Sequence, residues 1–426
     1  MTVQTADLPK ASCNEIVDGG AWRRMRQACL DDPGAFHGDL ARRSISWYLR
    51  QEGDNGVWAH FDDASGRWTA WDASTAAPVA VDLSASFEPW DAALDASDPP
   101  HFRWFRGGYT NACFNEVDRH VLAGHGDETA LIFEGDRWDM SRNAGRGGPV
   151  DSYSVSRKHL LLESAKCALA LKALGLKAGD RIALNMPSIP AQIYWTEGAK
   201  RLGIIYTPVF GGFSDKTLSD RIADAGARVV ITADGSYRNA QLVPFKPNYT
   251  DPALDNFVPV DVAMQLLRNA LAQEALGVAD EHAQAIIATV EGLLAGEVTV
   301  ERSDVMRGVG RALADLGRDT AMAAHQLAAV RIAIAESLVG SPARVDAVVV
   351  VRHTAQPDLI WNPERDHWSH DLTEKAGADI LAAARAAGLD VADEAALLAL
   401  PDEDFVRAIW AASPVLAVDA EYPKYR

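Results

Sequence analysis

One short glycine-containing string offers the clearest place for binding chemistry. Residues 208–214 read Pro-Val-Phe-Gly-Gly-Phe-Ser and lie between a predicted strand at 204–209 and a predicted helix at about 215–224. Adjacent glycines permit a tight turn and a close approach of the backbone to a ligand. The free N–H groups of the following helix favour an anion. The string therefore suits an anionic group, although a plain connecting loop can have the same composition.

A second candidate is Arg238, which ends the string Ile-Thr-Ala-Asp-Gly-Ser-Tyr-Arg just past a predicted strand at 228–233. Ligands of open parallel sheets gather at the carboxyl ends of the strands. A guanidinium there can hold a phosphate through two hydrogen bonds. The alternative interpretation is a solvated surface arginine without a ligand.

The segment around His367 and His370 invites a metal hypothesis, because Asp366 and Asp371 flank the two histidines. A zinc site usually needs a further Cys, His or acidic ligand at a suitable spacing. None is visible here, so we predict no metal site, and we single out no catalytic residue. Gly-Val-Gly at 308–310 imitates a dinucleotide fingerprint but has no strand before it, which leaves a nicotinamide-dependent oxidoreductase poorly supported.

Alternating strands and helices must position these residues. The pattern predicts a helix at 156–174, a strand at 181–186, a helix at 191–202 and then the strands and helix on either side of the glycine string. This order indicates βαβ units and a parallel sheet, hence an α/β fold. Four Ala- and Leu-rich helical runs follow, near 261–276, 280–295, 303–317 and 320–338, before a strand at 345–351 resumes the sheet. We interpret the helical block as an insertion.

The start of the chain has its own character. Residues 51–100 contain ten acidic residues, a single basic one, Arg67, and four tryptophans, with a strand, a turn at 62–66 and a second strand. Buried tryptophans mostly pack, so a structural module is favoured over a ligand platform. The predicted segments are an N-terminal extension with short strands (1–100), an α/β core (101–255), a helical insertion (256–343) and a return to the core (344–426).

Composition limits the classes of function. The 426 residues include 41 Lys and Arg against 59 Asp and Glu, a formal charge of −18, which disfavours broad nucleic-acid binding. The most apolar helical stretch, 321–340, contains charged residues and reads as a buried or amphipathic helix, so no membrane partner is expected. Residues 1–10 show no signal peptide. The cysteines form no C-x-x-C pair and suit a reducing, cytoplasmic location; they are Cys13, Cys29, Cys113 and Cys167.

Several blocks resemble the AMP-forming acetyl- and propionyl-CoA synthetases, in that family's order and over most of 100–250 and 344–371. The blocks are Trp104-Phe105, Gly107-Gly108, Asn115, Asp118-Arg119-His120, Leu174-Gly175, Gly179-Asp180-Arg181, Met186-Pro187, Ile189-Pro190, residues 208–214, Arg221-Ile222, Asp224-Ala225, residues 231–234, Arg365-Asp366, Trp368 and His370-Asp371.

The resemblance implies an adenylate-forming ligase that uses ATP with Mg to convert a carboxylic acid into an acyl-adenylate and then transfers the acyl group to CoA. It further implies that Phe210, Gly211, Gly212 and Arg238 contact the CoA nucleotide. The family has a second arginine where this chain has Gln241. A charge-assisted hydrogen bond contributes about 1.5–3 kcal/mol, so we expect weaker CoA binding here unless Lys246 compensates.

The chain also departs from the family pattern. The family's phosphate loop, its adenine and acyl pockets and its mobile C-terminal domain with the catalytic lysine are not recognisable here. Residues 418–423 resemble the stretch just before that loop, and residues 424–426 fit nothing expected there. We therefore interpret the sequence as the N-terminal part of a ligase, and we expect it to form no acyl-adenylate alone, because catalysis requires groups placed around the phosphates.

The acidic, Trp-rich start and the insertion resemble the propionyl-CoA synthases, fused enzymes that add a dehydratase and an NADPH-dependent reductase to the ligase. This favours 3-hydroxypropionate over propionate or acetate as substrate, with NADPH relevant only to a fused reductase. The insertion would then dock against later domains, or it is a packing insert without a separate role. The alternative is a non-catalytic half or scaffold that assembles with a partner subunit or as a homo-oligomer, because an incomplete sheet exposes a strand edge.

Overall fold

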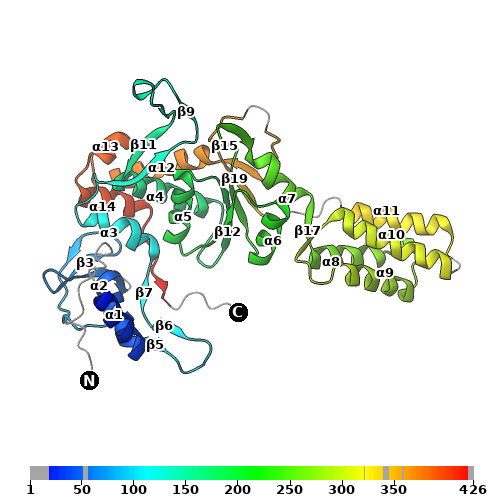
Figure 1. The fold of residues 1–426 in the computed structure, drawn as a ribbon, viewed down its shortest axis with the longest axis horizontal. Coiled ribbons are helices and arrows are strands. Elements are labelled where there is room, and N and C mark those ends of the chain that lie inside the picture. The colour runs from blue at the N-terminus through cyan, green and yellow to red at the C-terminus, as the bar shows by residue number, and fades with distance from the viewer. Residues whose placement is uncertain (1–18, 51–55, 321, 339–344, 357–358, 421–426) are drawn as a thin grey trace.

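A five-stranded parallel sheet forms the centre of the protein (Figure 1). The computed structural model describes residues 19–50, 56–320, 322–338, 345–356 and 359–420. The strands run in the order β13 (Ile205–Phe210), β12 (Arg181–Met186), β14 (Val229–Ala233), β19 (Ala347–Val351) and β20 (Asp366–Trp368). The predicted strands at 181–186, 204–209, 228–233 and 345–351 are confirmed to within two residues at each end, whereas β20 was not anticipated.

Alternate residues of each central strand face opposite sides of the sheet, as strand geometry requires. Ile182, Ile231 and Val349 pack in one core against α4 (Arg157–Ala173) and α5 (Pro190–Arg201). On the other face, Ala183, Val230 and Val348 pack against α6 (Asp215–Ala225) and α7 (Asp251–Asp255). Both faces of the sheet are therefore buried, which explains why its strands read as apolar runs without alternation.

Local signals set the ends of these helices. The Ser156 hydroxyl accepts a hydrogen bond from the His159 N–H (3.2 Å) at the start of α4, and the Ser214 hydroxyl does the same for Thr217 (3.3 Å) at the start of α6. Helix α6 ends at Gly226, whose φ of 59° is left-handed. The N-caps and the C-terminal glycine explain why the predicted helix limits differ from the observed ones by only a few residues.

The N-terminal extension packs on the core. Its sheet has the order β1 (Trp47–Leu49), β2 (Val57–Asp62), β3 (Arg67–Asp72), β4 (Pro78–Val79), which confirms the predicted strand, turn and strand. The buried Trp58 ring stacks on Phe114 of the core at 4.2 Å, and Trp410 of α14 (Asp402–Ala412) lies in the same cluster. These contacts agree with a structural role for the tryptophans.

A fully buried ion pair joins distant parts of the core. Arg201 Nη1 lies 2.8 Å from the Asp118 carboxylate, and both side chains have no exposed surface. The Arg201 guanidinium also donates to the Ser413 carbonyl (2.6 Å), and Trp410 Nε1 donates to Asp118 (2.7 Å). Asp118, one of the residues that carry the family resemblance, therefore has a structural position.

The four predicted helical runs form a separate bundle that projects from one end of the molecule (Figure 1). The helices are α8 (Val260–Leu271), α9 (Asp280–Leu293), α10 (Arg302–Asp319) and α11 (Ala324–Leu338). At the base of the bundle, β17 (Phe257–Pro259), which was not predicted, pairs with β18 (Thr299–Glu301). None of the described helices has the length and apolarity that a membrane span requires.

The other described elements surround the sheet and the extension. They are α1 (Gly19–Asp31), α2 (Pro33–Ser44), β5 (Ala92–Asp95), β6 (Arg103–Arg106), β7 (Tyr109–Thr110), α3 (Arg119–Leu122), β8 (Thr129–Glu134), β9 (Trp138–Asp139), β10 (Gly148–Pro149), β11 (Ser152–Ser156), β15 (Gly235–Arg238), β16 (Gln241–Pro244), α12 (Ser369–Ala386), α13 (Glu394–Leu398) and β21 (Val418–Asp419). Cys13 and residues 1–10 and 421–426, to which some expectations refer, lie outside the described residues.

Candidate functional site

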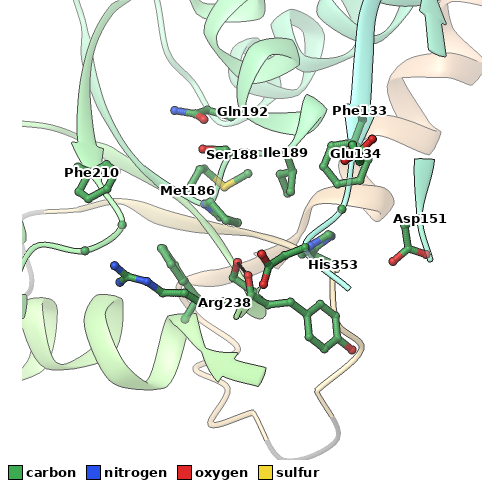
Figure 2. A pocket seen from close by; sticks show the side chains of 18 of the residues that line it. Phe133, Glu134, Asp151, Met186, Ser188, Ile189, Gln192, Phe210, Arg238 and His353 are labelled. Carbon is green, nitrogen blue, oxygen red and sulfur yellow. Dashed lines mark hydrogen bonds between the residues drawn. The ribbon is translucent and has the colours of Figure 1, made fainter. Parts of the chain in front are cut away.

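A cavity of about 760 Å³ opens where the central strands end (Figure 2). Its walls come from the segments that follow β12, β13, β14 and β19 at their carboxyl ends, together with the end of β8. The lining residues include Phe133, Glu134, Asp136, Asp151, Met186, Ser188, Ile189, Gln192, Phe210, Gly211, Gly212, Tyr237, Arg238, Phe245 and His353. The sheet therefore brings together Phe210, both glycines and Arg238, four of the five predicted site residues.

Gly211 and Gly212 have no room for a side chain. Neither has a positive φ. A methyl group on Gly211 would lie 2.4 Å from the Phe245 ring, and one on Gly212 would lie 2.8 Å from the Phe210 ring. Aromatic rings thus lie close to the backbone at both glycines, and the approach of a ligand to this loop stays a prediction.

Arg238 lines the cavity beside this loop. A methyl group on Gly212 would be 3.7 Å from Arg238 Nη1, and Figure 2 shows the guanidinium on the same side as Phe210. No hydrogen bond or ion pair engages this guanidinium among the residues that the structure describes. The segment after β14 is a hairpin, β15–β16, which was not predicted. Arg238 is its last residue before the turn.

Gln241 and Lys246 do not line the cavity. Gln241 is exposed and faces Arg238 directly across the hairpin. Lys246 is fully buried and lies 2.8 Å from Asp251 and 2.9 Å from Asp366. Lys246 therefore does not replace the missing arginine, because its ammonium group pairs with these two carboxylates inside the core, and weaker CoA binding stays a prediction.

The helix terminus at the cavity belongs to α5 and not to α6. Ser188, Ile189 and Gln192, around the first turn of α5, line the cavity, and the N-cap residue Ile189 supplies no capping side chain. The first turn of α6 is instead capped by Ser214. Backbone N–H groups at a helix N-terminus that lack a side-chain acceptor favour a negatively charged ligand. The signal in the sequence was Pro190, because proline is common at the first helical position.

The opposite end of the cavity is acidic. Glu134 and Asp151 lie there (Figure 2), and Asp151 pairs with Arg137 at 2.7 Å. Asp136 lies beside the Arg238 hairpin instead, where it accepts a hydrogen bond from the Ala240 N–H (2.9 Å). Burial lowers the pKa of His353, which leaves its ring neutral and able both to donate and to accept a hydrogen bond. This end suits hydrogen-bond donors, whereas the Arg238 end suits an anion.

The side chains of residues 365–371, for which we considered a metal site, make contacts within the protein. The Asp366 carboxylate binds Lys246 and Arg365 (2.9 Å each), and His370 Nε2 lies 3.3 Å from its neighbour Asp371. Across the described parts of the chain, no group of three or more His, Cys, Asp or Glu side chains could hold a metal ion.

Two family models match this part of the chain. Residues 118–284 match the family described as "AMP-binding enzyme", and residues 79–115 match "Acetyl-coenzyme A synthetase N-terminus". These matches include every element that lines the cavity except the segment after β19. The chain thus contains a region similar to AMP-binding enzymes and to the N-terminal segment of acetyl-coenzyme A synthetases.

Curated relatives agree with this class. An acetyl-coenzyme A synthetase of Rhodopirellula baltica is 39% identical over 182 residues, which are 43% of this chain and 26% of that protein. One of Streptomyces avermitilis is 41% identical over 176 residues, 41% of this chain and 24% of that protein. One of Magnetococcus marinus is 31% identical over 241 residues, 56% of this chain and 30% of that protein. The chain spans about a quarter of the length of the first two relatives.

Proposed function

We propose that the cavity binds the nucleotide part of coenzyme A and belongs to the CoA site of an AMP-forming acyl-CoA ligase. The observation that carries this proposal is the Arg238 guanidinium, which lies beside Gly212 in the cavity wall with no hydrogen bond or ion pair to the described residues. The volume of about 760 Å³ lies within the range of small-molecule sites. The family matches supply the chemistry of the ligand.

Each part of CoA has a suitable neighbour. Its phosphates are anionic and would pair with Arg238, with support from the N-terminus of α5. The Phe210 ring, 67% exposed, offers a face on which the adenine would stack. Gly211 and Gly212 allow the ligand to approach the backbone. Gln241, on the same face of the hairpin as Arg238, adds hydrogen-bonding groups but no charge.

Calorimetric titration of the chain with CoA and with dephospho-CoA tests this proposal. We expect CoA to bind about tenfold or more tightly than dephospho-CoA, because an arginine–phosphate bond contributes about 1.5–3 kcal/mol. Arg238→Ala should make the two affinities equal. The matched control is Arg311→Ala, an exposed arginine of α10 far from the cavity. Equal affinity of the unaltered chain for both ligands would reject the proposal.

For the whole protein, we propose ATP- and Mg-dependent activation of a short carboxylic acid, with 3-hydroxypropionate ahead of propionate and acetate. The acetyl-CoA synthetase relatives support a short acid, and the acidic start and helical insertion favour a fused propionyl-CoA synthase. Pyrophosphate release by the natural full-length polypeptide, with each acid in turn, tests the order. A clear preference for acetate, or no NADPH oxidation by that polypeptide, would reject 3-hydroxypropionate and the fusion respectively.

The alternative is a non-catalytic module that assembles with a partner subunit. It is favoured by four apolar side chains that are exposed around β8–β11, beside the acidic end of the cavity: Ile132 (77%), Trp138 (52%), Met140 (65%) and Tyr153 (51%). Exposed apolar side chains of this size suit contact with another protein. Absence of CoA binding together with a stable complex of defined stoichiometry would favour this alternative over the ligase.

A further inference from the structure

The hairpin that carries Arg238 is held from outside by the loop between β8 and β9. The Asp136 carboxylate accepts a hydrogen bond from the Ala240 N–H in the hairpin turn (2.9 Å). The next residue, Arg137, places its guanidinium over the Tyr237 ring at 4.6 Å. These two contacts reach the residues on either side of Arg238, one in the turn and one in the strand.

The hairpin needs such support. Both turn residues are left-handed, with φ of 51° at Asn239 and 58° at Ala240. Two-residue hairpin turns of this kind favour Asn-Gly, and an alanine in the left-handed region is unfavourable because its Cβ approaches the following carbonyl oxygen. A two-stranded hairpin is also marginally stable without further packing. The turn conformation therefore depends on contacts made outside the hairpin.

The loop that supplies these contacts is itself fixed. β8 pairs with β11, and the pairing continues past the strand ends, since Gly135 N donates to Asp151 O and Val150 N donates to Arg137 O (2.7 Å each). The Arg137 side chain is oriented by its ion pair with Asp151 (2.7 Å). Asp136 and Arg137 thus present fixed groups to the hairpin from the loop that follows β8.

The position of Arg238 depends on its backbone and not on contacts of its side chain. Its own guanidinium has no partner that would hold it among the described residues. The location of its backbone is set by Tyr237 and Ala240, which are the residues that the loop contacts. A shift of the hairpin would carry Arg238 away from Gly212 without unfolding the sheet, because β15 and β16 pair with no other strand of the described residues.

We propose that Asp136 and Arg137 are positioning residues for recognition of the CoA 3′-phosphate by Arg238. This inference rests on the proposed function. Neither residue need touch the phosphate, and the negative charge of Asp136 would oppose it. Their contribution is to fix the hairpin so that the guanidinium faces the loop at 210–212 before the ligand arrives, which lowers the entropic cost of binding.

The test measures the ratio of the dissociation constants of dephospho-CoA and CoA for the unaltered chain and its variants. Asp136→Ala removes the acceptor for Ala240, and we expect the ratio to fall about three- to tenfold, with little change for dephospho-CoA. Asp136→Asn keeps an acceptor oxygen and should retain most of the ratio. The matched control is Asp139→Ala, an acidic residue of the adjacent β9 that binds Ser141 and not the hairpin.

A double variant of Asp136 and Arg238 distinguishes a positioning role of Asp136 from a general effect on packing. In Arg238→Ala, adding Asp136→Ala should leave the ratio unchanged, since both changes act through one guanidinium. Equal ratios for Asp136→Ala and the unaltered chain, when Arg238→Ala abolishes discrimination, would overturn the positioning role while the CoA site stands. No discrimination in the unaltered chain would overturn the proposed function and this inference with it.

Should Asp136→Ala lower the melting temperature markedly, Arg137→Lys provides the second variant. It keeps the positive charge beside Asp151 but loses the planar group over Tyr237. A reduced ratio at an unchanged melting temperature would support the inference, and an unchanged ratio would contradict the role of Arg137.

Discussion

The Asp234 carboxylate accepts a hydrogen bond of 2.8 Å from the backbone N–H of His353, a residue more than a hundred positions later in the chain. It also accepts from the N–H groups of Gly235 (2.7 Å), Thr354 (3.0 Å) and Gln356 (3.1 Å), and it is fully buried. One side chain thus ties the end of β14 to the segment after β19, and this tie places His353 in the cavity wall.

Replacing Asp234 should therefore loosen the site as well as the fold. Asp234→Ala leaves buried N–H groups without an acceptor, and we expect it to lower the free energy of unfolding by about 3 kcal/mol or more. Asp234→Asn keeps the oxygen that receives Gly235, His353 and Thr354, so its loss should be about half as large. Urea unfolding measures both variants. Equal effects of Ala and Asn would show that the hydrogen-bonded oxygen is not what matters.

Gly211→Ala should displace the Phe245 ring, since the added methyl group would lie 2.4 Å from that ring. Overpacking of this kind costs about 1–3 kcal/mol, and the distorted cavity wall should bind CoA more weakly. The matched control is Gly310→Ala in α10, where the new methyl group meets nothing within 4 Å and helix propensity predicts a gain of about 0.5–1 kcal/mol. Similar behaviour of the two variants would contradict the steric explanation.

Arg201→Met should be among the most destabilising single changes in the core. It leaves the Asp118 carboxylate buried without its cation, for which we expect a loss of about 3–5 kcal/mol. The matched change is Arg268→Met, which breaks an ion pair with Glu291 whose side chains are 46% and 49% exposed. Exposed pairs contribute less than about 1 kcal/mol. Thermal and urea unfolding of both variants should differ accordingly, and comparable losses would be evidence against the burial argument.

Gln241→Arg should tighten CoA binding about three- to tenfold at low salt, because the new guanidinium lies across the hairpin from Arg238 on the same face. Without ligand, the two like charges repel, so the melting temperature should fall slightly. Calorimetry in low and high salt measures the first effect, with Gln284→Arg in α9 as the control for added charge. Unchanged affinity would show that position 241 does not reach the ligand.

Stability should fall as the pH drops below neutrality, in part through His60. Burial, and then the nearby Arg119, lower the pKa of His60 from 6.5 to about 4. The folded protein therefore holds this ring neutral, while the unfolded chain binds a proton below pH 6.5. The resulting stability is complete above pH 6.5 and is lost as the pH falls towards 4, by up to about 3 kcal/mol.

His60→Gln should reduce the difference between the unfolding free energies at pH 7 and pH 4, compared with the unaltered chain. His325→Gln, an exposed histidine of α11, serves as the control and should leave the pH profile unchanged. An identical profile for His60→Gln and the unaltered chain would exclude His60 as a source of the acid sensitivity.

Much of the fold could be predicted because its signals are local. The apolar strands, the Ser156 and Ser214 caps and the terminal Gly226 each act within a few residues, so the central βαβ units and the four helices of the insertion were predicted closely. β20 was missed because only three residues pair, and β17 because its strand is short and meets β18 some forty residues later.

The site was less predictable because its contacts are long-range. Arg238 and the glycine loop were singled out on strand-end chemistry, and the cavity brings them together. The sequence left open whether Lys246 replaces the missing arginine, because its partners, Asp251 and Asp366, are set by the tertiary fold. Nothing local in the sequence shows that Asp136 touches Ala240 or that Asp234 holds the segment of His353.

The pairing of β14 with β19 imposes an order on the synthesis of this protein. Val229 pairs with Ala347. The edge of β14 therefore stays unpaired while the ribosome adds more than a hundred residues. During that interval the bundle α8–α11, which has its own core, emerges and can condense first. The nascent chain thus carries an open strand edge, with its unpaired backbone groups, until β19 has been synthesised.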